Sequence, residues 1–306
     1  MLTYYANRGA ELGYLKVATP ELDSTTLVYG SELTRAEAHS LVKLLKLEEH
    51  LVSDVFDDDE LPRIEVHDDL RYVFLRSPRP VGSAVRSNPV LIVIGHHLFA
   101  CLSAAKIEID EMAHPPLDKK HIAPPLLMIE ALAAIAKRYE SLIDSIGTTI
   151  EQTETRLHSH EATNKDFIGF VTLEGNLSRS KMNLAGIEAV TERLIDSAAS
   201  KADREILDDI KLFIRQLLVE IDSHMQAIES IRNAYTTVAN NTLNQRMKTL
   251  TMLTLLVALP NVFYGMFGMN VGLPFADAPW AYASIVGFTI LIIFVTYLIA
   301  KKFKLF

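Results

Sequence analysis

The pattern of apolar and polar positions changes twice along the chain and divides it into three parts. Short apolar or alternating runs typical of β-strands fill the first hundred residues, at 12–17, 26–29, 70–75, 90–94 and 98–102. Long stretches with apolar residues at helical spacing follow, and two continuous apolar runs come last. This order predicts an α+β domain with a mixed sheet and helices, then a long helical stalk, then two C-terminal transmembrane helices.

The segment that begins at Thr34 predicts a helix over one face of the sheet. Thr34 and Glu37 have the spacing of a capping box, in which each side chain bonds the other residue's backbone N–H. Apolar residues then recur at helical spacing, at Ala38, Leu41, Leu44 and Leu45.

After paired prolines at 115–116 and 124–125, the chain reads as almost wholly helical. Two long antiparallel helices are expected over 126–159 and 165–200. From about residue 202 a heptad pattern predicts a third helix, packed in coiled-coil fashion against its own chain or against copies. Its core positions are Leu207, Ile210, Ile214, Leu217, Ile221, His224, Ile228, Ile231, Tyr235 and Val238. His224 is the polar exception, and we interpret it as an interface histidine.

No residue that breaks a helix separates the heptads from the first long apolar run. That run carries no charge from Thr249 to Met269, and a bilayer span needs about 20 mostly apolar residues. We therefore predict spans at about 249–269 and 281–300. The expected parts are a cytosolic α/β domain over 1–120, cytosolic helices including the stalk over 121–245, and a membrane domain over 246–306.

Small and polar residues recur on one face of the first span, at intervals of three and four. They are Asn244, Met247, Thr251, Thr254, Ala258, Asn261, Gly265 and Gly268. The opposite face is expected to present an apolar surface to lipid or to neighbouring helices, through Leu253, Leu256, Leu259, Val262 and Phe263. One interpretation is close helix packing, because small residues let transmembrane backbones approach. The other is a water-filled pore lined by this stripe in a symmetric oligomer. The second span has bulky apolar residues on most faces, which predicts a place at the lipid-facing periphery.

Charge and composition narrow the class of partner. The 306 residues carry a formal net charge of −8, which disfavours nucleic acid and suits cations. The N-terminus lacks a signal-peptide pattern, and the single cysteine, Cys101, suits a reducing compartment. Arg246 and Lys248 precede the first span, and Lys301 and Lys302 follow the second. By the positive-inside rule, both termini face the cytoplasm of a plasma-membrane protein.

The outer end of the first span carries a motif. Gly268-Met269-Asn270 follows an aromatic residue and closes the first of two terminal spans after a long soluble region. This arrangement resembles the signature of the CorA family of divalent-cation channels. The resemblance implies a funnel-shaped homopentamer in the lipid bilayer, with the first span lining the pore.

The same resemblance implies roles for particular residues. Gly268, Met269 and Asn270 would form the selectivity filter, where Asn270 meets the hydrated ion through water. Met247 and Leu250 match an apolar constriction that gates by dewetting. Further pore-lining positions are Asn244 at the inner mouth, Thr251, Thr254, Ala258, Asn261 and Gly265. The cargo expected from the family is Mg²⁺, with Co²⁺ and Ni²⁺ as further cargo.

Two interpretations of a pair of stalk aspartates bear on regulation. Family members bind regulatory Mg²⁺ between cytosolic domains through acidic side chains, and Asp209, beside Asp208, falls at such a position. The segment that would supply the partner acid, 77–89, contains Arg79 and Arg86 and no Asp or Glu. A solvated stalk face is an equally good interpretation of the two aspartates. The loop after the motif also lacks the usual acid, unless Asp277 replaces it.

Two alternatives stay open. The first is a proton-coupled Zn²⁺ or Co²⁺ transporter of the ZntB type, and the second is a non-conducting membrane scaffold. An enzyme tethered by two spans finds little support, because the sequence has no Gly-rich phosphate loop, HExxH, GxSxG or Cys-His arrangement. The sequence leaves the physiological ion, the transport mode and the resting state undecided.

Overall fold

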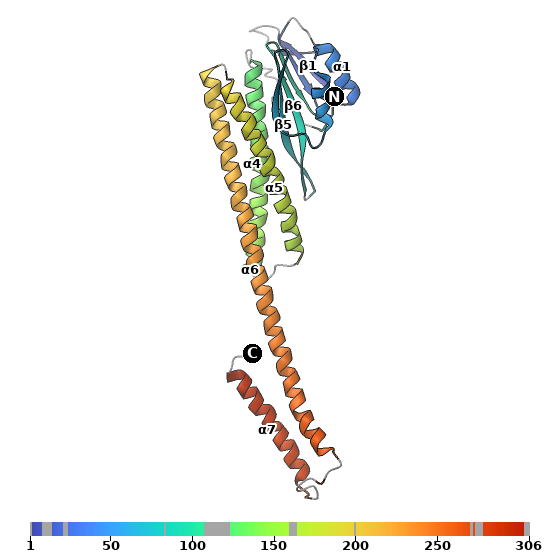
Figure 1. Ribbon diagram of the computed structural model, residues 1–306, viewed down its shortest axis with the longest axis vertical. Helices are drawn as coiled ribbons and strands as arrows, with labels where there is room; N and C mark the ends of the chain where they lie inside the picture. The colour runs from blue at the N-terminus through green and yellow to red at the C-terminus, as the bar shows by residue number, and fades with distance from the viewer. Residues whose placement is uncertain are drawn as a thin grey trace. The chain divides into compact units, whose positions relative to one another are not determined.

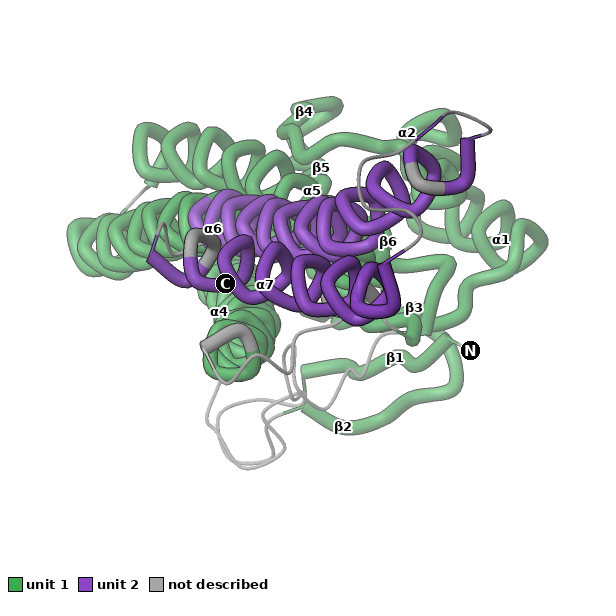
Figure 2. The backbone as a smooth tube through the Cα atoms, turned by 90° about the horizontal axis from the view of Figure 1, so that it is seen from below, with its two compact units in different colours: residues 1–229 green, residues 230–306 purple. Residues whose placement is uncertain are grey.

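The computed structural model describes residues 2–7, 14–20, 24–82, 84–106, 123–158, 164–198, 200–269, 272 and 278–302. The chain divides into two compact units, residues 1–229 and 230–306, which have different colours in Figure 2. One helix, α6 (Lys201–Phe267), contributes residues to both. The predicted boundaries near 120 and 245 stay predictions, because 107–122 lie outside the described residues and α6 passes through 245 unbroken.

Unit 1 is built on a seven-stranded mixed sheet with the order β2-β1-β3-β7-β6-β5-β4 (Figure 1). Neighbouring strands are antiparallel, except that β3 and β7 run parallel. The strands are β1 (Leu2–Asn7), β2 (Tyr14–Val17), β3 (Thr26–Gly30), β4 (Arg63–His67), β5 (Leu70–Val81), β6 (Ala84–Ile94) and β7 (Leu98–Leu102). The predicted fold class, a mixed sheet with helices followed by long helices, is confirmed.

Each apolar run predicted as a strand overlaps an observed strand. β5 and β6 extend past the predicted runs to form one long hairpin, in which Arg79 pairs with Arg86. β1 and β4 were not predicted. β4 is a short edge strand with alternating charges, and its residues are half-buried or exposed, so it lacks the apolar signal of a buried strand.

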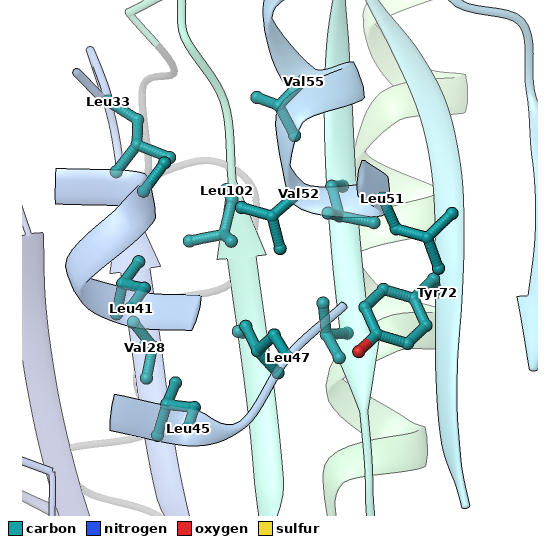
Figure 3. Packing of buried hydrophobic residues seen from close by; sticks show 14 of the residues in the cluster. Val28, Leu33, Leu41, Leu45, Leu47, Leu51, Val52, Val55, Tyr72 and Leu102 are labelled. Atoms are coloured by element: carbon teal, nitrogen blue, oxygen red, sulfur yellow. The ribbon is translucent and has the colours of Figure 1, made fainter. Parts of the chain in front are cut away.

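One face of the sheet is covered by α1 (Arg35–Leu45) and α2 (Glu49–Ser53). The predicted capping box is present: the Thr34 N–H donates to Glu37 Oε2 at 2.9 Å, and the Glu37 N–H donates to Thr34 Oγ1 at 3.3 Å. Apolar side chains of both helices meet the sheet in one cluster (Figure 3), which includes Val28, Leu33, Leu41, Leu45, Leu47, Leu51, Val52, Val55, Tyr72 and Leu102. Burying each such side chain contributes about 1.5–3 kcal/mol.

The alternate residues of the central strands point to the other face, which α4 (Pro124–His158) and α5 (Asn164–Asp196) cover. The Tyr139 hydroxyl of α4 donates to the Arg76 carbonyl of β5 at 3.1 Å. The Val85 N–H of β6 donates to Asn176 Oδ1 of α5 at 3.0 Å. Both bonds are buried, so they fix the two helices against the β5–β6 hairpin.

The first part of α6 lies against α5 of its own chain. Ion pairs between described residues join the two helices. The partners on α5 advance by seven and then four residues while those on α6 recede by seven and then four, as antiparallel packing requires. The pairs are Lys181 with Asp222 at 2.6 Å, Glu188 with Arg215 at 2.6 Å, and Glu192 with Lys211 at 2.8 Å. The predicted heptad positions from Leu207 to Ile231 are buried, apart from the partly exposed His224, whereas Val238 is 45% exposed.

Unit 2 contains the last part of α6 and α7 (Ala281–Lys302). The rings of Phe263 on α6 and Phe288 on α7 pack edge to face, with centroids 5.3 Å apart and planes at 89°. On α7, Ile285, Thr289, Ile292 and Thr296 form a buried or half-buried face at intervals of four, three and four. The Thr289 hydroxyl donates to the Ile285 carbonyl at 2.8 Å, which satisfies the polar group in this setting.

Candidate functional site

The polar stripe of the sequence lies along the last part of α6, and its described residues are exposed. Met247 is 54% and Leu250 58% exposed, and Met269 at the far end is 61% exposed. The remaining positions are exposed as well: Asn244, Thr251, Thr254, Ala258, Asn261, Gly265 and Gly268. Nothing in the described part of unit 2 covers the stripe.

The second helix of unit 2 packs on the opposite side of α6. Besides Phe263, the buried or half-buried residues of this part of α6 include Met252, Leu256, Leu259 and Pro260. At about 100° per residue, the centre of this face lies roughly 160° from the centre of the stripe. Leu253 and Val262, which the sequence suggested for the same apolar face, are both 58% exposed. The helix therefore keeps its intramolecular contact and its polar stripe on nearly opposite faces.

Oxygen atoms on the stripe are suited to accept hydrogen bonds from the water of a hydrated cation. The Thr254 hydroxyl donates its proton to the Leu250 carbonyl at 2.9 Å, so the oxygen keeps its acceptor lone pairs. Asn261 has an amide oxygen, which is also an acceptor. Mg²⁺ holds its water strongly, so neutral acceptors that bind the hydrated ion suit it better than a cage that strips it.

The end of α6 adds a favourable potential for cations. The aligned peptide dipoles of a helix give its C-terminal end a partial negative charge. Gly268 and Met269 lie directly at this end, where their N–H groups donate to the carbonyls of Tyr264 at 3.0 Å and Met266 at 3.3 Å. Asn270 and Asp277, which the sequence also singled out, lie outside the described residues.

No packing contact among the described residues explains why position 265 is a glycine. A Cβ built on Gly265 meets nothing within 4 Å in the described structure. Glycine costs about 1 kcal/mol relative to alanine inside a helix. A close approach by another chain, or the need for open space along the stripe, would account for the residue.

Among the described residues, the stalk acids Asp208 and Asp209 are not brought together with an acid from another element. Asp208 and Asp209 are exposed on α6, and no described residue forms an ion pair with either. In the β5–β6 hairpin, Arg79 and Arg86 face each other across the strands.

A different group of metal-ligating side chains was missed by the sequence analysis. Ligand atoms of Glu48, His67 and Asp68 lie within 4.8 Å of one another, at the β4–β5 turn and before α2. Glu48 accepts from His67 at 3.2 Å and from His50 at 3.5 Å when these histidines are protonated. The groups are half-buried or exposed.

Both helices of unit 2 have the length and composition of membrane spans. Windows of 18 residues in α6 and α7 have mean hydropathies of 1.5 and 2.1, and only 11% and 6% of their residues are buried within the chain. The core helix of a soluble protein would be mostly buried, so these windows are better matched to lipid or to other chains.

Comparison with known proteins gives consistent matches. A family model described as CorA-like Mg²⁺ transporter protein matches residues 30–302. The cobalt/magnesium transport protein CorA of Methanocaldococcus jannaschii is 23% identical over 275 residues, which cover 86% of each chain.

Two solved structures share the fold over nearly the whole chain. The complete structure of the CorA magnesium transporter from Methanocaldococcus jannaschii matches with a TM-score of 0.88 and 19% identity, covering 98% of this chain and 97% of that one. The full-length CmaX protein matches with a TM-score of 0.76 and 18% identity, covering 97% of this chain and 96% of that one. The order of sheet, long helices and two terminal helices is therefore a shared architecture.

Proposed function

The chain belongs to the CorA family of Mg²⁺ transporter proteins, and from this premise we propose that it conducts hydrated Mg²⁺ through a pore lined by the stripe of α6. Transport of divalent cations is the activity of the family. The specific proposal concerns the ion and the residues: Mg²⁺ as cargo, Co²⁺ and Ni²⁺ as further cargo, and Gly268, Met269 and Asn270 as the outer filter.

The observation that carries this proposal is the division of α6 into two faces. α7 occupies one face through Phe263 and leaves the polar stripe exposed. In a bilayer, exposed amide and hydroxyl groups at such positions are costly unless they face a bundle interior or water. Closed rotational symmetry brings one stripe from each copy to a common axis. A homopentamer, as the family resemblance implies, would place α6 inside and α7 outside.

Along the proposed pore, apolar and polar residues have different roles. Met247 and Leu250 are large and apolar, so a ring of them near the cytosolic end can exclude water and close the pore. Thr251, Thr254 and Asn261 provide acceptors further out. Asn244 lies at the inner mouth, and the termini face the cytoplasm of the plasma membrane in the orientation that Arg246 and Lys302 favour.

The test measures ion flux into proteoliposomes. We expect Mg²⁺ uptake that does not depend on a proton gradient, and Asn270→Ala should abolish it while the oligomer stays intact. Thr249→Ala is the control on the same helix, because Thr249 is exposed and lies about 160° around the helix from the centre of the stripe. Unaltered flux in Asn270→Ala would remove the filter assignment, and absence of flux from an intact wild-type oligomer would favour the scaffold.

One alternative cargo is tested by the same assay. The loop between the spans, 271–279, has Asp277 as its only acid, which weakens the case for collecting Mg²⁺ at the outer mouth. A proton-coupled carrier of Zn²⁺ or Co²⁺ would show uptake of these ions that rises with an imposed pH gradient. Mg²⁺ uptake indifferent to that gradient excludes the carrier.

Asp208 and Asp209 remain the proposed residues for a regulatory cation on the stalk. If cytosolic Mg²⁺ closes the channel through them, Asp208→Asn/Asp209→Asn should reduce its inhibition of flux. An unchanged inhibition curve would assign these carboxylates to the solvated face of α6. The absence of an acid in 77–89 favours the second outcome.

A further inference from the structure

Four side chains that can bind metal come together where the β4–β5 turn meets the start of α2. Ligand atoms of Glu48, His67 and Asp68 lie within 4.8 Å of one another. His50 is next to them: its Nδ1 lies 3.5 Å from Glu48 Oε2, while His67 Nδ1 lies 3.2 Å from Glu48 Oε1. We call these four residues of unit 1 the His–carboxylate cluster: Glu48, His50, His67 and Asp68.

The fold positions both halves of this cluster. The Glu48 N–H donates to the hydroxyl of Tyr72 at 3.0 Å, and Tyr72 is buried in the core cluster of Figure 3. Glu48 precedes α2, but its side chain does not cap the helix, so the carboxylate is available to a ligand. On the other side, His67 ends β4, and Asp68 and Asp69 make the turn to β5 with φ of 46° and 62°. Two consecutive positive φ values are typical of a tight type I′ hairpin turn.

The distances within the cluster are close to those of a metal site. Donor atoms around a tetrahedral Zn²⁺ lie about 2.0–2.2 Å from the metal and hence roughly 3.3–3.6 Å from one another. The two histidine nitrogens have nearly this spacing from the Glu48 oxygens, at 3.2 Å and 3.5 Å. The ligand atoms of Glu48, His67 and Asp68 need a contraction from at most 4.8 Å.

The two imidazole rings can complete that contraction. The ring centroids of His50 and His67 are 6.4 Å apart, with planes at 78°. Two imidazoles on one tetrahedral ion have centroids roughly 5 Å apart. Because the two side chains are 64% and 49% exposed, rotation about their own bonds can close the difference without moving the backbone.

The charge of the cluster also suits a divalent cation. With neutral imidazoles, the carboxylates of Glu48 and Asp68 carry two negative charges. A neutral imidazole has one ring nitrogen with a free lone pair, which a metal can use. A divalent ion would therefore neutralise both carboxylates and use the two histidines as ligands.

We propose that the His–carboxylate cluster binds a divalent transition-metal ion of the class of Zn²⁺, Co²⁺ and Ni²⁺, in preference to Mg²⁺. Imidazole nitrogen suits these ions, whereas Mg²⁺ prefers an octahedral shell of oxygen atoms and keeps several waters. The ion would join the start of α2 to the β4–β5 hairpin, so its binding should stabilise unit 1. This site goes beyond the proposed function, because its ligands lie outside the stripe of α6 and it does not depend on which ion the membrane domain conducts.

The test is isothermal titration calorimetry with Zn²⁺ on the full-length protein in detergent, after treatment with EDTA and removal of the chelator. We expect a saturable site that takes one Zn²⁺ per chain. A roughly hundredfold excess of Mg²⁺ should leave this binding in place, because Mg²⁺ competes poorly for imidazole. The proposal is wrong if Zn²⁺ does not bind, or if Mg²⁺ displaces it at equal concentration.

Variants locate the site. His67→Ala and His50→Ala change exposed side chains, so the fold should persist while Zn²⁺ affinity falls about tenfold or more for each. Asp68→Asn should also weaken binding and should keep the turn, because asparagine tolerates positive φ. His39→Ala is the matched control: His39 Nδ1 also lies beside a glutamate, 3.1 Å from Glu49 Oε1, but outside the cluster.

Thermal unfolding separates loss of a ligand from loss of the fold. Without metal, wild type, His39→Ala and His67→Ala should unfold at similar midpoints, because surface ion pairs of histidine contribute little. Zn²⁺ should raise the midpoint of wild type and His39→Ala and leave that of His67→Ala unchanged. Zn²⁺ affinity that is equal in His67→Ala and wild type, or equally weakened in His39→Ala and His67→Ala, would overturn the proposal.

Discussion

The imidazole of His224 on α6 lies directly over Gly147 on α4: a Cβ built on Gly147 would come within 2.7 Å of His224 Cε1. Real Cβ atoms essentially never approach other atoms this closely. The glycine that interrupts the apolar pattern of α4 therefore has a packing reason. His224, the polar exception among the heptad positions of α6, therefore packs against α4 at Gly147, where α4 has no side chain.

We expect Gly147→Ala to destabilise unit 1, because the new methyl group forces His224 or the helices apart at a cost of about 1–3 kcal/mol. The measurement is the midpoint of thermal unfolding in detergent. Gly175→Ala on α5 is the matched control, since its Cβ meets nothing within 4 Å and alanine favours the helix by up to about 1 kcal/mol. His224→Ala should relieve the effect of Gly147→Ala, and two independent, additive effects would contradict the contact.

The edge-to-face pair of Phe263 and Phe288 should hold α7 against α6. Such a pair contributes about 0.5–1.5 kcal/mol beyond its buried area. Phe288→Ala should therefore lower the unfolding midpoint of the membrane unit more than Phe294→Ala, which removes a ring that is 57% exposed on the same helix. Equal shifts would mean that the ring pair does not stabilise the contact between the helices.

The capping box of α1 gives a prediction that depends on pH. Hydrogen bonds from the Thr34 backbone and hydroxyl hold the pKa of Glu37 below its usual value of 4.5. A carboxylate with a lowered pKa in the folded state stabilises the fold above its unfolded pKa, and this contribution is lost as pH falls through the folded value. Thr34→Ala should cost about 0.5–2 kcal/mol at neutral pH.

The unfolding midpoints of wild type and Thr34→Ala, measured from pH 7 down to pH 3, test this directly. The difference between the two proteins should shrink as Glu37 becomes protonated. Ser40→Ala is a control on the same helix, because the Ser40 hydroxyl bonds only the Ala36 carbonyl within α1. A difference that stays constant across this range would show that Glu37 does not take part in the cap.

How far the sequence predicts the fold depends on whether the signal is local. The Thr34 cap and the strand around Val28 were predicted because a capping box and a short continuous apolar run are patterns of neighbouring residues in the sequence. β4 was not, because its place at the sheet edge follows from pairing with β5. Its apolar face is short and poorly buried, since Ile64 is half-buried and Val66 is 67% exposed. Pairing between distant segments gives little signal in the sequence of either segment alone.

The same distinction applies to the candidate sites. The exposed stripe of α6 was predictable because it is a period within one helix. The face that meets α7 was not fully predictable: Val262 was expected there and is exposed, whereas Pro260 is buried there. The pocket lined by Arg79 of β5 and Lys137 of α4 was not predicted, because these residues are far apart in sequence and approach only when α4 packs on the β5–β6 hairpin.

Cys101 should be unreactive in the folded protein. Burial raises the pKa of its thiol to about 12, and the side chain lies within the sheet core, so both the thiolate and access to it are lacking near neutral pH. Iodoacetamide at pH 8 should label the native protein no faster than it unfolds, and label the denatured protein fully, as read by mass spectrometry. The chain has one cysteine, so any rapid labelling of native protein would place Cys101 outside the core.

Gly265 and Gly287 provide a matched pair that separates pore lining from general helix effects. A Cβ on either glycine meets nothing within 4 Å of the described structure, so valine at either place should leave the packing of the single chain intact. Gly265 lies on the stripe of α6, and Gly287 lies on the exposed side of α7. If the stripes of several copies surround a pore, Gly265→Val adds a ring of apolar groups and should reduce Mg²⁺ flux by about tenfold or more. Gly287→Val should leave flux near the wild-type level, and equal fluxes in the two variants, with the oligomer intact, would remove Gly265 from the pore wall.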